Sequence, residues 1–435
     1  MRLLRTTGRG AAETRRVLSA LENRRESTAE SVMPAVNRIV RAVQKDGDKA
    51  LRKFAAQFDS LSPQSPLQIS NEEMEQAWHQ ISQSIKSALK VAASNIRAFA
   101  KRQLPASWSF SPTSGLSTGQ MVRSICAVGC YVPSGRHPLP SSLLMTAIPA
   151  QVAGVPRIVV ASPNPAAETL AAAHLLGIKE FYRIGGAQAI AALAYGTETI
   201  VRVDKIVGPG NLYVTTAKRM VAFDCAIDML AGPTEIVVTS DTGDPAYIAA
   251  ELIAQAEHDP EALAILVTTR PDLASQVISE VKLRVKANAT AKQSLATNGY
   301  VFVASSAQEA RQITNRLAPE HLTVDAASDT EWVQNAGSVF IGSLSPQPMG
   351  DYVSGPNHTL PTGGLARVRG GLSVLDFVKL ITVQQYDEAS LRKLGPSAIA
   401  LAEAEGLMGH AAAIRARGMG NGSASAKTAE AKSHA

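Results

Sequence analysis

The stretch Leu317-Ala318-Pro319-Glu320-His321-Leu322 separates a segment with helical periodicity from a segment that alternates like a strand. Proline fixes its own φ and moves the residue before it out of the helical region, so we expect the helix over 307–317 to end here. Apolar Leu322, Val324 and Ala326 then alternate with polar residues, which predicts a strand. A helix that passes directly into a strand is typical of an α/β fold.

Glu320 and His321 place a carboxylate beside an imidazole at the start of this strand. Histidine is the side chain most easily tuned for proton transfer near neutral pH, so the two residues are a candidate acid/base pair. Neighbouring side chains on a strand point to opposite faces, and we therefore expect the pair to reach one site from different directions rather than to bond each other. The alternative interpretation is a surface turn that carries two polar residues.

Short apolar runs alternate with helical segments on both sides of this stretch. A first series consists of residues 127–132, 157–161, 180–184, 205–207 and 226–229. A second series consists of residues 235–239, 262–268, 300–303 and 338–341. Strands that alternate with helices imply βαβ units and parallel sheets. We predict an α/β protein with two Rossmann-like parallel-sheet domains and helical N- and C-terminal extensions.

The pattern also predicts boundaries between the parts of the chain. We expect an Arg-rich N-terminal arm over 1–26, a first α/β domain from 27–121 plus 234–371 with a helical N-terminal part, a second domain over 122–233, a C-terminal helical extension over 372–417 and a disordered tail over 418–435. The first hundred residues are mostly helical by periodicity and carry no obvious chemistry.

The net charge of +6 lies at the two ends of the chain. Residues 1–26 hold seven Arg against three Glu, and residues 411–435 hold four Lys or Arg against one Glu, which leaves the remainder nearly neutral. Nucleic-acid binding needs a basic stripe on a folded face, so we expect no nucleic-acid partner. No apolar run reaches the roughly 18 residues that span a bilayer, and the N-terminus lacks the apolar core of a signal peptide. We expect a cytoplasmic protein without membrane contact.

Several polar side chains are spaced to converge on one site. Asp244-Pro245 predicts a helix start, and on that helix Gln255 and His258 lie on one face with Glu251. A histidine near a helix C-terminus is also explained by the helix dipole alone. The other combinations of acid and imidazole are Asp351 with His358 in a Gly-rich loop and Glu405 with His410 near the C-terminus. Nitrogen and oxygen ligands from scattered stretches suit catalytic Zn²⁺ or a related divalent ion.

Two glycine-rich turns are candidates for cofactor binding. Gly185-Gly186-Ala187-Gln188 and Gly208-Pro209-Gly210-Asn211 each follow a predicted strand and open a helix. Small residues at such a turn let a phosphate or ribose approach backbone N–H groups at the positive end of the helix. The chain has no G-x-G-x-x-G motif, and tight turns without a ligand are the alternative.

With these stretches in place, the chain resembles the histidinol dehydrogenase family from about Ser31 to Arg417. The segments that carry the resemblance are Gly129-Cys130-Tyr131-Val132-Pro133, Pro140 to Gly154, Gly208 to Arg219, Ala231-Gly232-Pro233-Thr234-Glu235, Gln255-Ala256-Glu257-His258, Pro319-Glu320-His321-Leu322 and Gly350 to Pro361. Their common order along the chain makes the resemblance specific.

The resemblance implies an NAD-dependent, zinc-assisted enzyme that oxidises L-histidinol to L-histidine through the aldehyde, in the last steps of histidine biosynthesis. It implies Glu320 and His321 as the acid/base pair, and Gln255, His258, Asp351 and His410 as zinc ligands. Substrate would contact these ligands together with Thr234, His321, His358 and Glu405, and NAD would contact Tyr131, Gln188 and Asn211. It further implies a catalytic and metal-binding first domain, an NAD-binding second domain and an intertwined homodimer, in which residues 372–417 supply His410 and Glu405 to the partner.

The sequence departs from the family pattern at three positions. Thr234 stands where Ser is usual, Gln347 where many members have Glu, and Ser134 where Gly is usual. One alternative is therefore a relative that oxidises another amino- or sulfo-alcohol, such as a sulfopropanediol dehydrogenase-like enzyme. Glu405, which suits an imidazole N–H, argues against it. The other alternative is a non-catalytic binding protein on the same fold, which the intact acid/base pair and metal ligands oppose.

Overall fold

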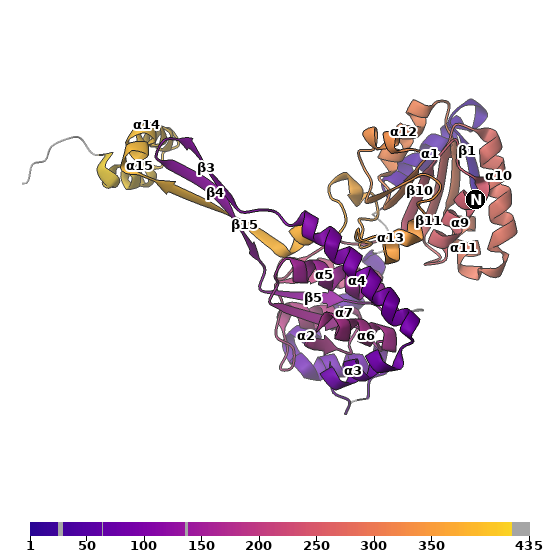
Figure 1. Ribbon diagram of the computed structural model, residues 1–435, viewed down its shortest axis with the longest axis horizontal. Helices are drawn as coiled ribbons and strands as arrows, with labels where there is room; N and C mark the ends of the chain where they lie inside the picture. Colours follow the sequence, from indigo (N-terminus) through magenta and orange to yellow (C-terminus); the bar gives the residue numbers. More distant parts are fainter. Residues whose placement is uncertain (25–28, 63, 135–137, 420–435) are drawn as a thin grey trace, which may run out of the picture. The chain divides into compact units, whose positions relative to one another are not determined.

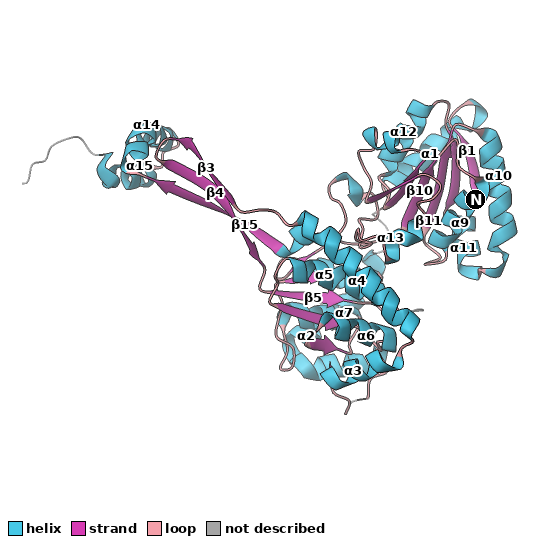
Figure 2. Cartoon of the chain, in the orientation of Figure 1, coloured by secondary structure: helices cyan, strands magenta, loops and turns pink. Residues whose placement is uncertain are grey.

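The computed structural model describes residues 1–24, 29–62, 64–134 and 138–419, which form two compact units (Figure 1). The larger unit comprises Met1–Leu104 and Ser124–Val378 and holds two six-stranded sheets flanked by helices (Figure 2). The smaller unit comprises Pro105–Arg123 and the chain from Lys379 onward. Among the described helices, none is long and apolar enough to cross a membrane.

Sheet A is entirely parallel. In spatial order it contains β1 (Arg2–Arg5), β12 (Gly299–Val303), β11 (Leu263–Thr268), β10 (Glu235–Thr239), β13 (His321–Val324) and β14 (Ser338–Ile341). On one face Ile236 and Val238 pack with α9 (Pro245–Ala256), α10 (Pro271–Arg284) and α11 (Ala289–Thr297). On the other face Val237 packs with α1 (Ala11–Glu22) and α12 (Ala307–Leu317). Because both faces are buried, its central strands are continuous apolar runs.

Sheet B is parallel except at one edge. In spatial order it contains β2 (Gln68–Ile69), β7 (Glu180–Tyr182), β6 (Arg157–Ala161), β5 (Ala127–Tyr131), β8 (Lys205–Val207) and β9 (Ala226–Ile227), with β2 antiparallel to β7. One face packs with α2 (Ala29–Phe58), α7 (Gly186–Tyr195) and α8 (Leu212–Val221). The other packs with α3 (Asn71–Gln80), α4 (Gln83–Gln103), α5 (Pro140–Val152) and α6 (Ala167–Leu176).

The two sheets are wound in the same order. In sheet A the chain runs outward from β10 through β11 to β12 and returns to add β13 and β14 on the other side. In sheet B it runs from β5 through β6 to β7 and returns to add β8 and β9. The order therefore reverses between β10 and β13 and between β5 and β8. Such reversals leave a crevice at the carboxyl ends of the strands, where open α/β sheets bind ligands.

The smaller unit combines a three-stranded sheet with helices. The sheet has the order β15 (Val378–Tyr386), β4 (Leu116–Ser124) and β3 (Trp108–Thr113), and the helices are α14 (Glu388–Ala404) and α15 (Met408–Ile414). Asp387 caps α14, since its carboxylate accepts the Ser390 N–H at 2.7 Å. Several apolar side chains on β3 and β15 are exposed, among them Trp108, Phe110, Leu380 and Ile381.

The predicted α/β class with two parallel sheets is confirmed, and each predicted run contains a strand. The helical character of the first hundred residues is also confirmed. Helix α2 is interrupted at Gly47, whose φ is +51°. The prediction of an N-terminal arm over 1–26 is wrong. Arg2–Arg5 adds the edge strand β1 to sheet A, and helix α1 packs on α12.

The packing differs from the predicted domain partition in two further places. Helices α2, α3 and α4 pack on sheet B rather than with 234–371, because amphipathic periodicity shows that a helix has a buried face but not which sheet covers it. The extension predicted as helical over 372–417 contains strand β15, which follows a short 3-10 helix at Val374–Phe377 and pairs with β4. The tail expected over 418–435 lies outside the described residues from 420 onward.

Candidate active site

Glu320 and His321 lie where α12 passes into β13. The helix ends at Leu317 as predicted, and Ala318 adopts a left-handed conformation with φ of +46°, rare for a residue with a Cβ. Pro319 follows, Glu320 lies in a bend, and His321 is the first residue of β13. Both side chains of the pair are buried. The turn therefore delivers an acid and an imidazole to the amino end of sheet A.

Two donors at the start of the neighbouring strand β10 contact Glu320. The Oε2 atom of Glu320 accepts hydrogen bonds from the Thr234 hydroxyl at 2.6 Å and from the Glu235 N–H at 2.8 Å. The same Oε2 lies 3.5 Å from Nδ1 of His321. The expectation that the pair would approach from different directions is wrong, because Glu320 lies in the bend before the strand, where side chains do not alternate.

The two ring nitrogens of His321 have different surroundings. Nδ1 lies 3.1 Å from the Glu235 carbonyl oxygen, which can only accept, so in the neutral ring Nδ1 carries the hydrogen. Nε2 has no hydrogen-bond partner among the described residues and lies 3.5 Å from Oδ1 of Asp351. Burial lowers the pKa of His321, but the carboxylates of Glu320 and Asp351 raise it by a larger amount, and the resulting pKa is about 10. Nε2 is therefore the atom that can exchange a proton.

Asp351 lies beside this imidazole, and Gln255 is linked to Glu320 through the Thr234 hydroxyl. Gln255 lies in the last turn of α9, which returns the chain to the amino ends of the strands, and its amide nitrogen donates to the Thr234 hydroxyl. Its Oε1 is buried and has no partner among the described residues. Asp351 lies on the short helix α13 (Gln347–Tyr352), and its Oδ2 accepts from the amide of Gln347 at 2.6 Å.

Two further histidines influence Asp351. Burial raises the pKa of the Asp351 carboxyl, but His321, His358 and His258 outweigh it and lower the pKa. His358 Nδ1 lies 2.8 Å from the Asp351 carbonyl oxygen, and its Nε2 lies 3.4 Å from the Ser142 hydroxyl on α5. His358 thus connects the site at sheet A with a helix of sheet B.

The structure brings together all but two of the predicted metal and substrate residues. Thr234, Gln255, His321, Asp351 and His358 are linked by the contacts described above, near the amino ends of β10 and β13. His258 lies near enough to Asp351 to lower the pKa of its carboxyl. Glu405 and His410 are exposed residues of the smaller unit. Within the described ranges, no group of three or more His, Cys, Asp and Glu side chains is arranged to hold a metal ion. The gathered donors include the amide of Gln255, which is not among these types.

The predicted cofactor residues lie at the carboxyl ends of sheet B. Tyr131 ends β5, and its hydroxyl accepts the Gly186 N–H at 3.1 Å. Asn211 is exposed and caps α8, with Oδ1 accepting the N–H groups of Tyr213 and Val214. Gln188 lies in the first turn of α7. The order of the strands reverses between β5 and β8, so Tyr131 and Asn211 flank the crevice where a nucleotide is expected.

Asp59 holds the first of the two glycine-rich turns, and the sequence analysis did not identify it. Its Oδ2 accepts from the Gly185 N–H at 3.0 Å and from the Gln188 amide at 3.1 Å. Burial raises the pKa of this carboxyl, although these two hydrogen bonds oppose the shift. Asp59 and Gln188 are 129 residues apart, so no local pattern could connect them.

A buried ion pair holds the second glycine-rich turn. Lys218 and Asp228 lie 2.5 Å apart with both side chains almost fully buried. Lys218 donates to the Gly208 carbonyl oxygen at 2.7 Å, and Asp228 accepts the Gly208 N–H at 2.7 Å. Both backbone groups of Gly208 are thus fixed between Tyr131 and Asn211.

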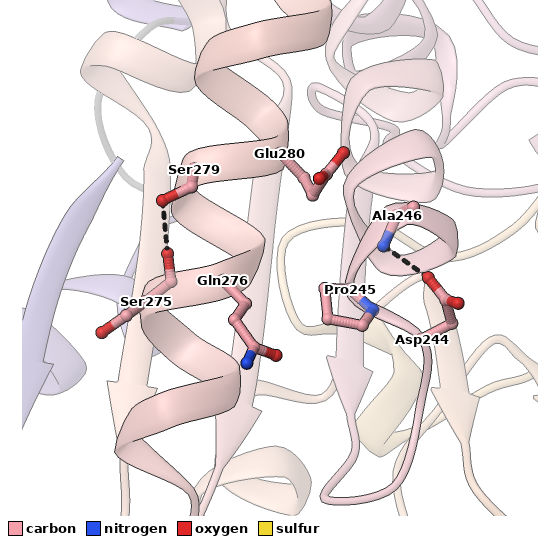
Figure 3. A pocket seen from close by; sticks show the side chains of 7 residues that line it. All are labelled: Asp244, Pro245, Ala246, Ser275, Gln276, Ser279 and Glu280. Atoms are coloured by element: carbon pink, nitrogen blue, oxygen red, sulfur yellow. Dashed lines mark hydrogen bonds between the residues drawn. The ribbon is translucent and has the colours of Figure 1, made fainter.

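A surface depression elsewhere does not belong to this site. It has a volume of about 420 Å³ and lies between the N-terminal part of α9 and helix α10. Figure 3 shows the side chains that line it, including Asp244, Gln276 and Glu280. None of the predicted site residues lines it, and Gln255 lies at the opposite end of α9.

The fold and the site define an α/β enzyme in which a sheet of the nucleotide-binding type accompanies a buried pair of a carboxylate and an imidazole. Comparison with known proteins specifies the class further. The family profile described as histidinol dehydrogenase matches residues 22–418. Histidinol dehydrogenase of Methanothermobacter thermautotrophicus is 45% identical over 92% of this chain and 97% of its own, and that of Geobacillus kaustophilus is 46% identical over 94% and 97%. The crystal structure of histidinol dehydrogenase from Elizabethkingia anophelis matches with a TM-score of 0.90 and 35% identity, covering 96% of this chain and 98% of that one.

The chain therefore belongs to the histidinol dehydrogenase family.

Proposed function

We propose that this chain carries out the reaction that names its family, the NAD-dependent, zinc-assisted oxidation of L-histidinol to L-histidine through histidinaldehyde. The observation that supports it best is the buried pair of Glu320 and His321. The ring presents an unpartnered Nε2 beside Asp351, and the carboxylate is oriented by Thr234 and Glu235. A general base needs a fixed ring with one nitrogen free to exchange a proton. Because the carboxylates of Glu320 and Asp351 raise the pKa of His321 to about 10, Nε2 carries a proton at neutral pH, and it would become an acceptor when a cation held by Asp351 offsets that carboxylate.

The donors around His321 suit a zinc ion. Gln255 Oε1 is a buried acceptor with no partner among the described residues, and a cation would satisfy it. Asp351 and His258 supply a carboxylate and an imidazole, and we assign His410 as the fourth ligand. Tyr131, Gln188 and Asn211 would hold NAD at the carboxyl ends of sheet B. When bound, Zn²⁺ supplies charge that orients the substrate's nitrogens, and NAD⁺ accepts hydride.

His321 serves the first oxidation. Its Nε2 takes the proton of the alcohol while hydride leaves the same carbon, which gives the aldehyde. The hydrogen on Nδ1 stays with the Glu235 carbonyl and fixes the ring during this transfer. Thr234, His358 and Glu405 would contact the substrate, with Glu405 facing its imidazole N–H.

Glu320 serves the second oxidation. Both hydrogen bonds from Thr234 and Glu235 fall on Oε2, which leaves Oε1 to take a proton from water. The resulting hydroxide adds to the aldehyde, and the hydrate anion loses the second hydride to give the carboxylic acid, which releases its proton to solvent and leaves as the carboxylate. Because water reacts only in this half, Glu320 and His321 have separate tasks.

We further propose that the enzyme is a homodimer in which His410 and Glu405 act in the partner's site. Both residues are exposed on the smaller unit, which is compact by itself. Its sheet exposes Trp108, Phe110 and Leu380, apolar side chains that a second copy would cover. A two-fold interface lets each subunit receive the residues that it gives.

The test is an assay of NADH formation with L-histidinol. The proposal predicts two NADH and one L-histidine per L-histidinol, and loss of activity after zinc removal. Preferred oxidation of a sulfonated diol would identify a relative with another substrate. Absence of NADH with every alcohol, in a folded and zinc-loaded protein, would indicate a binding protein and contradict the proposal.

A further inference from the structure

Glu235 lies behind the catalytic pair and touches both members through its backbone. Its N–H donates to Oε2 of Glu320 at 2.8 Å, and its carbonyl oxygen lies 3.1 Å from Nδ1 of His321. Any movement of Glu235 would therefore change the orientation of the carboxylate and of the imidazole together. What fixes Glu235 also fixes the geometry of proton transfer.

The side chain of Glu235 is held by Arg24. Nε of Arg24 donates to Oε1 and Nη2 donates to Oε2, each at 2.6 Å, which is a bidentate pair. The Gly363 N–H adds a third hydrogen bond to Oε1 at 2.8 Å. Arg24 is 13% exposed and Glu235 4% exposed, so water weakens this ion pair little.

Arg24 also holds the turn that carries the catalytic pair. Nη2 donates to the carbonyl oxygen of Leu317 at 2.9 Å, and Nη1 donates to the carbonyl oxygen of Leu21 at 2.6 Å. Leu317 is the last residue of α12, directly before the left-handed Ala318. One guanidinium thus joins three elements: α1, the start of β10 and the turn before β13. The start of β10 contacts Glu320 and His321, and the turn before β13 leads directly into them.

We propose that Arg24 is a positioning residue for the Glu320–His321 pair, acting through Glu235 and the Leu317 carbonyl. The inference rests on the proposed roles of these two residues. A lysine could keep the charge but not the planar fork that meets two carboxylate oxygens and a carbonyl. Arg24 touches neither substrate nor cofactor in this account, so its loss should affect turnover and leave binding unchanged.

The test compares Arg24→Met and the double variant Arg24→Met/Glu235→Gln with wild type. Arg24→Met alone leaves the Glu235 carboxylate buried without its partner, whereas the double variant leaves no unpaired buried charge. The double variant therefore provides the test if Arg24→Met does not fold. We expect kcat to fall about 10–100-fold in both half-reactions, because displacement of reacting groups by about 1 Å has this effect. KM for NAD, KM for L-histidinol and zinc content should change less than about twofold. The solvent deuterium isotope effect on kcat should increase, since proton transfer becomes slower.

The matched control is Glu22→Gln. Glu22 pairs with Arg316 and connects the same helices, α1 and α12, but its partner is 51% exposed and the pair has no contact with Glu235. We expect this variant to keep wild-type kcat. A structural role of Arg24 alone would lower thermal stability and zinc content without raising the isotope effect, and that result would overturn the proposal.

Wild-type kcat in a folded Arg24→Met or double variant would also overturn it. His321→Asn, assayed in parallel, separates this failure from failure of the proposed function. If His321→Asn is inactive while the Arg24 variants turn over normally, only the inference about Arg24 is wrong. If His321→Asn keeps wild-type turnover, the assignment of the catalytic pair is wrong, and the inference falls with it.

Discussion

At the scale of single residues, Glu320 and His321 are distinguished by which of their atoms remain open. Nδ1 of His321 is committed to a carbonyl and Nε2 is not, while Oε2 of Glu320 is committed to two donors. In the proposed mechanism, proton transfer from the alcohol and activation of water therefore use different atoms of different residues. Substitutions of the two should have different effects on the two oxidations.

We predict that His321→Asn lowers turnover of L-histidinol by about 10²–10⁴-fold, the usual contribution of a general base. Metal and substrate binding should stay nearly intact, because asparagine can still donate to the Glu235 carbonyl. Glu320→Gln should leave alcohol oxidation nearly unchanged and slow aldehyde oxidation. Single-turnover NADH formation from L-histidinol and from histidinaldehyde measures the halves separately. Equal slowing of both halves by Glu320→Gln would contradict the division of tasks.

The proposed zinc ligands should contribute unequally. We predict that His258→Ala lowers zinc content more than Gln255→Ala, because a neutral amide oxygen is a weaker ligand than an imidazole. Gln347, which the resemblance does not count among the ligands, donates its amide N–H to Asp351, so its loss should weaken zinc binding by about 10–100-fold. Zinc measured on purified variants tests this order. Full occupancy in a His258→Ala/Asp351→Ala double variant would exclude the assignment.

At the scale of elements, the two sheets contribute opposite ends to the proposed enzyme. Sheet B presents the carboxyl ends of β5 and β8, where α/β proteins commonly bind nucleotides. The corresponding end of sheet A is closed by Asp325, which accepts hydrogen bonds from the Ser240 hydroxyl and from the N–H groups of Asp241 and Thr242. Because these three groups already donate hydrogen bonds to the Asp325 carboxylate, they are not free to donate to a phosphate. This supports NAD binding at sheet B.

The turn at Gly208 should be the most sensitive position of the cofactor site. Gly208 has φ of +115°, and an added Cβ would collide with the carbonyl oxygen of Tyr131. We predict that Gly208→Ala raises KM for NAD about tenfold or more, because about 1–3 kcal/mol of strain must be relieved by moving the turn. Affinity for zinc should not change.

Gly177→Ala is the control for this effect. Gly177 also has a positive φ, +66°, but an added Cβ would meet no described atom within 4 Å. This substitution should lower the free energy of unfolding by about 1 kcal/mol and leave KM for NAD unchanged. Comparable KM values in the two variants would show that the Gly208 turn does not bind the cofactor.

Most of the strands that the sequence predicted are buried on both faces, whereas the predicted edge strands β9 and β14 are not. Runs such as Leu263–Thr268 are recognised because a parallel sheet covered by helices is apolar throughout. Strands β1, β2, β3, β4 and β15 were missed, since each has at most one buried residue and shows no clear apolar periodicity. The adjacency of Glu320 and His321 is visible in the sequence itself. The ion pair of Arg24 could not be predicted from the sequence, because its partner Glu235 lies 211 residues away and only the fold brings the two residues together.

At the scale of the whole molecule, the proposed active site needs residues from both compact units. Gln255, His258 and Asp351 belong to the larger unit, and His410 and Glu405 belong to the smaller one. The sequence indicated this only through family resemblance, because no local pattern shows which subunit a ligand serves. In the proposed dimer, one chain supplies the acid/base pair and three zinc ligands, and its partner supplies His410.

Subunit exchange tests this claim most directly. An inactive His258→Ala chain is mixed with an inactive His410→Ala chain, and NADH formation from L-histidinol is measured after size exclusion confirms mixed dimers. If His410 acts in the partner's site, one site of each mixed dimer combines intact His258 with intact His410, and the other carries both defects. The account predicts recovery of about half the wild-type rate per mixed dimer, as a two-fold interface requires. Mixed dimers that stay inactive would contradict it and show that His410 serves its own chain or none.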